Sequence, residues 1–210
     1  MQYIYLHGFL SDSNSIKGTY LRKQFAQMGL TLLTPDLNVG DFQDLTLTRE
    51  LGVIDKLIAS SDEETTLLGS SLGGYLAVLY AQSHPLVTRL VLIAPAFRFA
   101  TRILEQMEPF IVKQWEKLGV LEIADEMGEN PRLLHYSIVK DALSYDAIPL
   151  NREIPTFIFH GLYDDIVSYS ASIEYLESNP LAQLLILPSD HTLIDNLETI
   201  WRHTRAFLEL

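Results

Sequence analysis

The chain has 210 residues, a formal net charge of −12 and a sequence pI of about 4.8. Hydrophobic residues make up 48% and charged residues 20%, a composition typical of a folded globular protein that argues against global disorder. The negative charge repels phosphate backbones, so we expect no nucleic acid partner. There is no cysteine, which excludes disulfides, thiolate metal sites and a cysteine nucleophile.

The N-terminus begins almost at once with a strand-like run, Tyr3-Ile4-Tyr5-Leu6. A signal peptide would instead begin with a basic region and end at a small-residue cleavage site. No apolar stretch approaches the ~20 residues that a transmembrane helix needs, so we expect no integral membrane association. These features predict a cytoplasmic protein, and they predict nothing about its oligomeric state.

Short apolar runs alternate with segments of helical periodicity along most of the chain. The runs predict strands covered on both faces, at Gln2 to Leu6, Thr31 to Thr34, Thr65 to Leu68, Arg89 to Ala94, Pro155 to His160 and Gln183 to Leu187. Helical spacing occurs at Tyr20 to Met28, Arg49 to Ile58, Gly74 to Gln82, Ala171 to Leu176 and Leu193 to Leu208. This alternation predicts an α/β fold with a parallel sheet and right-handed crossovers.

One region, residues 97–146, interrupts the alternation. Apolar residues recur there every three or four positions from Phe99 to Leu118, and no run predicts a strand. Glu129-Asn130-Pro131 indicates a boundary before a further helix, Arg132 to Leu143. We interpret residues 97–146 as a helical insertion within one domain that spans residues 1–210. The insertion is either a lid that lines an acyl pocket or a cap whose apolar face packs on the core.

Ser71 is the predicted nucleophile. It is the central residue of Gly69-Ser70-Ser71-Leu72-Gly73, which lies between a predicted strand and a predicted helix. A nucleophile elbow holds its serine on such a strand-to-helix turn, and crowding two residues to either side favours glycine. Ser70 is the rival candidate, but its corresponding neighbours are Leu68 and Leu72, which cannot relieve that crowding.

A serine nucleophile needs a base, and the base needs an acid to orient it. His191 follows the last predicted strand, where loops leave the carboxyl edge of the sheet, and is the predicted base. His84, His135 and His203 are interpreted as surface or packing residues. Asp164 and Asp165 both follow the strand Pro155 to His160, and the position in the run favours Asp164 as the acid. The other carboxylate is expected to cap the following helix or to face solvent.

His7-Gly8-Phe9 follows the first predicted strand, where a loop can supply one backbone N–H to an oxyanion hole. The second donor is expected to be the N–H of Leu72, directly after the nucleophile. Only backbone atoms act in this arrangement. His7 is therefore expected to orient the loop rather than to act as the base.

These motifs resemble the α/β-hydrolase superfamily over nearly the whole chain. Leu6-His7-Gly8-Phe9 and the Ser71 turn are similar to small bacterial YqiA/YcfP-type esterases. Tyr136-Ser137-Ile138-Val139-Lys140, the run from His160 to Val167, and Ser189-Asp190-His191 resemble acyl-protein thioesterases of the mitochondrial abhydrolase type. In both groups the motif serine, acid and histidine fall where Ser71, Asp164 and His191 fall here.

The resemblance implies a minimal six-stranded parallel sheet in the order 2-1-3-4-5-6, with helices on both faces, lacking the two leading strands of larger hydrolases. It also implies hydrolysis of esters or thioesters through an acyl-enzyme, with a small-molecule or acylated substrate and no cofactor or metal. One departure is Ser168 after Val167, where many relatives carry proline. The same fold hosts lyases, perhydrolases and non-catalytic binding modules, which are the alternative functions. Arg98 and Arg102 are candidates to meet an acidic substrate group, although exposed arginines are common.

Overall fold

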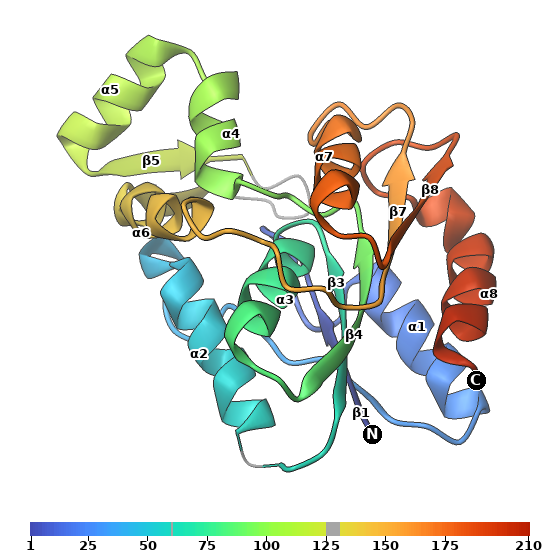
Figure 1. The fold of residues 1–210 in the computed structure, drawn as a ribbon. Helices are drawn as coiled ribbons and strands as arrows, with labels where there is room; N and C mark the ends of the chain where they lie inside the picture. Colours follow the sequence, from blue (N-terminus) through green and yellow to red (C-terminus); the bar gives the residue numbers. More distant parts are fainter. Residues whose placement is uncertain (60, 125–130) are drawn as a thin grey trace.

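The computed structural model describes residues 1–59, 61–124 and 131–210. Its centre is a six-stranded sheet in the order β2-β1-β3-β4-β7-β8, with every neighbouring pair parallel (Figure 1). The strands are β1 (Gln2–Leu6), β2 (Leu32–Leu33), β3 (Thr65–Ser70), β4 (Val87–Ile93), β7 (Thr156–Gly161) and β8 (Ala182–Leu187). Numbered within this sheet alone, their order is 2-1-3-4-5-6, which confirms the predicted topology.

Two hydrophobic cores lie on the two faces of the sheet. On one face Tyr5 and Phe159 pack with α1 (Ile16–Gln27) and α8 (Leu197–Leu208), which run side by side (Figure 1). Helices that pack on the other face include α2 (Leu47–Ile58), α3 (Leu72–Ser83) and α7 (Ser170–Ser178). Successive residues of a strand point to opposite faces, so strands between two cores must be apolar throughout. All six residues of β3 are buried.

Because the strands are parallel, the loops after β1, β3, β7 and β8 all leave the sheet at one edge. The short turn Phe42–Asp44 and α2 follow β2 on the way to β3. The closing helix begins later than predicted. Leu193 adopts φ 51°, and a single helical turn at Ile194–Asn196 precedes α8.

The segment between β4 and β7 departs from the prediction. It contains the helices α4 (Phe99–Gln106), α5 (Pro109–Leu118) and α6 (Ser137–Asp146), but also two strands, β5 (Val120–Ile123) and β6 (Arg132–His135). These strands pair antiparallel in a separate two-stranded sheet. The expectation of a purely helical insertion was therefore wrong.

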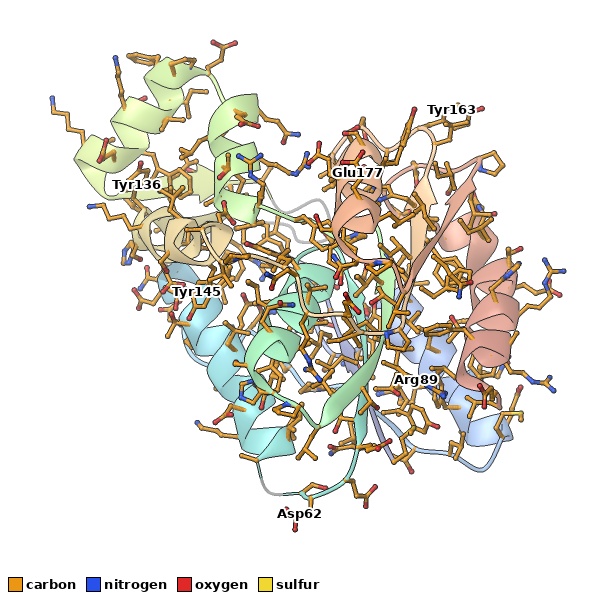
Figure 2. The ribbon with its side chains drawn as sticks, in the orientation of Figure 1. Asp62, Arg89, Tyr136, Tyr145, Tyr163 and Glu177 are labelled. Carbon is orange, nitrogen blue, oxygen red and sulfur yellow. The ribbon has the colours of Figure 1, made fainter. Side chains whose placement is uncertain are left out.

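Gly119 explains where this prediction failed. Its φ of 78° ends α5 in a left-handed residue, so the apolar spacing of α5 does not continue into Val120. The helix predicted from Arg132 to Leu143 is also different in the structure. Its first residues form the strand β6, and the helix α6 begins only at Ser137. Glu129 and Asn130 of the expected boundary lie outside the described residues. Tyr136, labelled in Figure 2, lies between β6 and α6. Its ring packs edge-on against that of Trp115, with the ring centroids 5.3 Å apart.

In the parts of the chain that the structure describes, no helix has both the length and the apolar character needed to cross a bilayer.

Candidate active site

Ser71 occupies the turn between β3 and α3 in a strained conformation, with φ 52° and ψ −119°. Residues other than glycine rarely adopt a positive φ, and such backbone strain concentrates at functional sites. Hydrogen bonds hold the turn. The Ser71 N–H donates to the Ile93 carbonyl at 2.9 Å, and the Ser71 carbonyl accepts the Ala96 N–H at 3.0 Å. The end of β4 therefore fixes the position of Ser71.

The glycines on either side of Ser71 are sterically required. A Cβ on Gly69 would collide with the carbonyl group of Gly73, and a Cβ on Gly73 would collide with the carbonyls of Leu6 and His7. The backbone of α3 thus begins in direct contact with the end of β1. A larger residue at Gly73 would push the start of α3 away from the end of β1, and a larger residue at Gly69 would open the turn that holds Ser71.

Ser71, His191 and Asp164 are linked by hydrogen bonds from three different loops. His191 Nε2 lies 3.0 Å from Ser71 Oγ, and His191 Nδ1 lies 2.8 Å from Asp164 Oδ2. A histidine protonated on Nδ1 donates to the carboxylate and accepts from the serine hydroxyl. Ser70 and Asp165, the rival candidates, have no hydrogen bond to His191. Asp165 is exposed, whereas the Asp164 side chain is fully buried.

The Asp164 carboxylate is fully used as an acceptor. Its Oδ1 accepts the N–H groups of Ile166 at 3.0 Å and Val167 at 2.8 Å. Burial alone would raise the pKa of Asp164. The hydrogen bonds from His160, His191 and Val167 outweigh burial and hold its pKa well below the usual range. Asp164 therefore remains ionised and can stabilise a positive charge on His191.

His160 is a site residue that the sequence analysis missed. Its side chain is fully buried, and its Nε2 lies 3.2 Å from Asp164 Oδ2 and 2.8 Å from the Val167 carbonyl. Ser172 Oγ lies 2.8 Å from the other ring nitrogen. The available signal was the spacing of His160 four residues before Asp164, at the end of a buried strand.

The loops that carry Asp164 and His191 are joined to each other. The Tyr163 N–H donates to the Ser189 carbonyl at 2.9 Å, and the Tyr163 side chain points outward at the end of the molecule (Figure 2). A Cβ on Gly161 would collide with the Asp190 carbonyl. This close approach of the two loops fixes the separation between the side chains of Asp164 and His191.

The loop after β1 passes beside Ser71. A Cβ on Gly8 would lie 3.1 Å from Ser71 Cβ and 3.8 Å from Ser71 Oγ. His7 is buried and holds this loop, because its Nε2 accepts the Leu37 N–H at 2.9 Å and its Nδ1 donates to the Gly8 carbonyl at 3.0 Å. Among the described residues, the N–H groups of Phe9 and Leu72 have no hydrogen-bond partner. Both remain available as donors near the serine.

A pocket of about 520 Å³ opens on Ser71 and His191. Its apolar lining comes largely from the β1 loop, α4 and the Asp164 loop, with Phe9, Phe99, Ile103, Ile166 and Val167 among the contributors. The Phe9 and Phe99 rings pack edge-on at 5.7 Å. Such a pocket accommodates an apolar group beside a polar reacting centre.

Of the two arginines suggested for an acidic substrate group, only Arg102 lines the pocket. Its Nε donates to the Phe97 carbonyl at 2.7 Å. Arg98 is exposed and lies outside the pocket lining.

The remaining histidines lie outside the pocket lining. The His84 ring stacks on Tyr80 at 3.6 Å, and His135 Nδ1 lies 2.8 Å from the Asp44 carboxylate. His203 packs beside Phe157. Their packing or surface roles agree with the sequence analysis. Within residues 1–59, 61–124 and 131–210, no three histidine, aspartate or glutamate side chains gather as metal ligands do.

Comparisons with known proteins give the same fold. The solved structure of alpha/beta hydrolase domain-containing protein 10 from mouse matches with a TM-score of 0.85 and 21% identity, covering 99% of this chain and 89% of that one. Est1E from Butyrivibrio proteoclasticus, solved with ferulic acid bound, matches with a TM-score of 0.82 and 20% identity, covering 99% and 87%. The predicted α/β-hydrolase fold is therefore confirmed.

A sequence relative is the human protein named palmitoyl-protein thioesterase ABHD10, mitochondrial, with 28% identity over 206 residues. The match covers 90% of this chain but 66% of the relative, slightly less than two thirds of its length. The names of these relatives agree with the prediction of an enzyme that acts on ester bonds. The signature of one family spans residues 2–209, nearly the whole chain with its Ser71 turn and both partner loops. The chain therefore belongs to the family described as Uncharacterised protein family (UPF0227).

Proposed function

We propose that this protein is a serine hydrolase that cleaves carboxylic esters or thioesters through an acyl-enzyme. One observation carries the proposal: the hydrogen-bonded chain from Asp164 through His191 to Ser71 opens on an apolar pocket of about 520 Å³. A histidine held between a buried carboxylate and a serine hydroxyl activates that hydroxyl as a nucleophile.

The geometry supports a two-step reaction. His191 Nε2 takes the Ser71 proton as Oγ attacks the substrate carbonyl, and Asp164 stabilises the imidazolium that forms. His191 then gives this proton to the leaving alcohol or thiol as the carbonyl–heteroatom bond breaks. Water, deprotonated by His191, attacks the acyl-enzyme, and the returning proton restores Ser71 as the carboxylic acid leaves.

The free N–H groups of Phe9 and Leu72 are the proposed oxyanion hole. The Leu72 N–H is at the first residue of α3, where the positive end of the helix dipole favours an anion. The closeness of Gly8 to Ser71 brings the Phe9 N–H to the same region. Loss of one such donor costs about 10²–10³ in rate in hydrolases of this type.

We propose that the apolar part of the pocket holds the acyl group and that the segment between β4 and β7 serves as its lid. Phe99 and Ile103 of α4 line the pocket, and Gln106 Nε2 donates to the Ile166 carbonyl at 2.9 Å. The human relative is named a palmitoyl-protein thioesterase, and this similarity supports an acylated substrate.

Two matched substitutions test the mechanism. Asp164→Asn keeps the shape of the side chain but removes its charge, and we expect kcat on 4-nitrophenyl esters to fall by about 10³–10⁴. Asp165→Asn makes the same change one residue away, on an exposed side chain without contact to His191, and should leave kcat within twofold. Equal activity of the two variants would contradict the assigned acid.

The nucleophile is tested by covalent labelling. A fluorophosphonate probe should form one adduct, which mass spectrometry should place at Ser71 rather than Ser70, and Ser71→Ala should abolish both labelling and turnover while the protein stays folded. An unlabelled Ser71 in folded protein, or esterase activity retained in Ser71→Ala, would refute the proposal.

A further inference from the structure

The pocket has a polar wall that the proposed acyl-transfer reaction does not use. Lys17, in the first turn of α1, lines the pocket, and its Nζ donates to the Thr192 carbonyl at 2.8 Å. Thr192 directly follows His191 and also lines the pocket. The ammonium group of Lys17 is thus held beside the loop that carries His191.

The charge of Lys17 is not neutralised by direct contact. The lysine is half-buried, and its hydrogen-bond partner is the neutral carbonyl of Thr192, so two of its N–H donors remain for a ligand. Across the described ranges Lys17 forms no salt bridge, and the carboxylates of Asp190 and Asp164 act on it only at longer range. A partly buried cation without a counter-ion is costly, and a bound anion removes that cost.

A second free donor lies in the same wall. Tyr5 is 1% exposed and lines the pocket, and its hydroxyl meets full hydrogen-bond geometry with no described residue, although the hydroxyls of Ser15 and Ser70 lie nearby. Burial raises the pKa of Tyr5 to about 12, against a smaller opposite effect of Ser15 and Ser70, so the hydroxyl keeps its proton. Buried hydroxyls usually have a partner, so an unsatisfied one on a residue that lines a pocket points to a ligand.

The Tyr5 ring also contacts the start of α1. A Cβ on Gly18 would lie 2.9 Å from both Tyr5 Cε1 and Ser15 Oγ, and Ser15 is the N-cap of this helix. The N-terminus of a 12-residue helix is positive and presents N–H groups that lack intrahelical partners. The cation, the free hydroxyl and the helix terminus therefore favour the same sign of ligand charge.

We propose that Lys17 and Tyr5 form a subsite for an anionic group, a carboxylate or a phosphate, carried by the leaving group of the substrate. The inference rests on the proposed hydrolase function. His191 Nε2 must reach the leaving oxygen or sulfur to protonate it, so the leaving group lies on the His191 side of the pocket. Lys17 donates a hydrogen bond to the carbonyl of Thr192, the residue after His191, and so lies on that same side.

Matched esters test the subsite. 4-Acetoxybenzoate, 4-acetoxyphenyl phosphate and the neutral methyl 4-acetoxybenzoate share one acyl group and differ in the charge of the leaving group. Wild-type protein should have a higher kcat/KM on at least one anionic ester than on the neutral ester. The anionic ester with the higher kcat/KM shows whether the subsite prefers a carboxylate or a phosphate. Lys17→Met should reduce this preference about tenfold, whereas Lys17→Arg, which keeps the charge, should retain most of it.

Three further variants make the result specific. Lys23→Met removes the same charge from an exposed position of α1 and should keep the preference within twofold. Tyr5→Phe deletes only the hydroxyl, which is not held in a hydrogen bond of full geometry, and should lower the preference without lowering the melting temperature. If Arg102→Met abolishes the preference while Lys17→Met leaves it intact, the assignment to Lys17 is wrong. Equal loss of kcat/KM on charged and neutral esters in Lys17→Met would show that Lys17 only holds the His191 loop.

A binding measurement separates this inference from the hydrolase proposal. The Ser71→Ala variant should bind 4-hydroxybenzoate or inorganic phosphate in calorimetry, and adding Lys17→Met should weaken the Kd at least tenfold. If no ester is hydrolysed but this binding is observed, the hydrolase function fails and the anion site remains. If Ser71→Ala binds neither anion, or the double variant binds equally well, the subsite is refuted.

Discussion

His160 Nε2 lies 3.2 Å from Asp164 Oδ2, the same carboxylate oxygen that accepts the hydrogen bond from His191. Both the His160 ring and the Asp164 carboxylate are fully buried. Asp164 is therefore held from two sides, by the ring of His160 at the end of β7 and by the turn that leads to Val167. This arrangement makes His160 a positioning residue for the carboxylate rather than a group that meets the substrate.

His160→Leu should lower kcat by about ten- to a hundredfold with little change in KM, because hydrogen bonds to charged groups contribute about 1.5–3 kcal/mol. His160→Gln can place an amide N–H near the position of Nε2 and should recover part of the loss. Melting temperatures of both variants would show that they fold. A fully active His160→Leu, or a change in KM alone, would contradict the positioning role.

The sheet was predictable because each strand between two cores is an apolar run, and the strand ends placed Ser71, Asp164 and His191 at one edge of it. Gln2 to Leu6 was predicted with its observed bounds, and the other sheet strands to within two residues at each end. The serine turn was predictable because neither of its glycines has room for a side chain: Gly69 lies against the backbone of Gly73, and Gly73 lies against the carbonyls of Leu6 and His7.

The errors have physical causes as well. The strands β5 and β6 form a two-stranded sheet with one face partly exposed, so their residues lack the continuous apolar pattern of the central strands. The role of His160 depends on a contact across the turn after β7, and the role of Lys17 on a contact with a residue 175 positions later. Sequence periodicity does not report contacts of either kind.

Gly73→Ala should destabilise the protein strongly, because the new Cβ would collide with the carbonyls of Leu6 and His7, both backbone groups that cannot move independently. We expect a loss of more than about 2 kcal/mol in the free energy of unfolding, together with loss of esterase activity. Gly52→Ala is the matched control, since Gly52 lies within α2 and nothing would approach its Cβ within 4 Å. It should stabilise the protein by about 0.5–1 kcal/mol. Urea unfolding of both variants gives the comparison, and a tolerated Gly73→Ala would refute the steric argument.

Ile103→Trp tests the acyl pocket. Ile103 lines the pocket from α4, so a larger side chain there should shorten the space available to an acyl chain. We expect kcat/KM on 4-nitrophenyl esters to fall at least tenfold for eight-carbon and longer chains while the acetate ester changes less than threefold, an effect of more than about 1.4 kcal/mol. Leu118→Trp, at an exposed position at the end of α5, should leave the chain-length profile unchanged. A parallel loss on all chain lengths would place the acyl chain elsewhere.

Glu50 predicts a stability that falls as the pH rises. The side chain is 2% exposed and its Oε2 has no hydrogen-bond partner among the described residues. Burial raises its pKa to about 8, Arg49 acts in the opposite direction, and Asp141 raises it further. Between about pH 4 and pH 8 the unfolded chain has lost this proton while the folded chain keeps it, so increasing pH favours unfolding.

Glu50→Gln should therefore be more resistant to urea than the wild-type protein at pH 8, by a difference on the order of a few kcal/mol, and much closer to it at pH 5. The neutral amide cannot ionise, so it avoids the cost of placing a charge in this buried position. Glu177→Gln removes a carboxylate from the exposed surface of α7 (Figure 2) and should leave the pH dependence of the wild-type protein unchanged. If the stabilities of Glu50→Gln and wild type change in parallel between pH 5 and pH 8, Glu50 is ionised in the folded protein throughout that range. In that case a countercharge such as Arg49 must compensate for its burial.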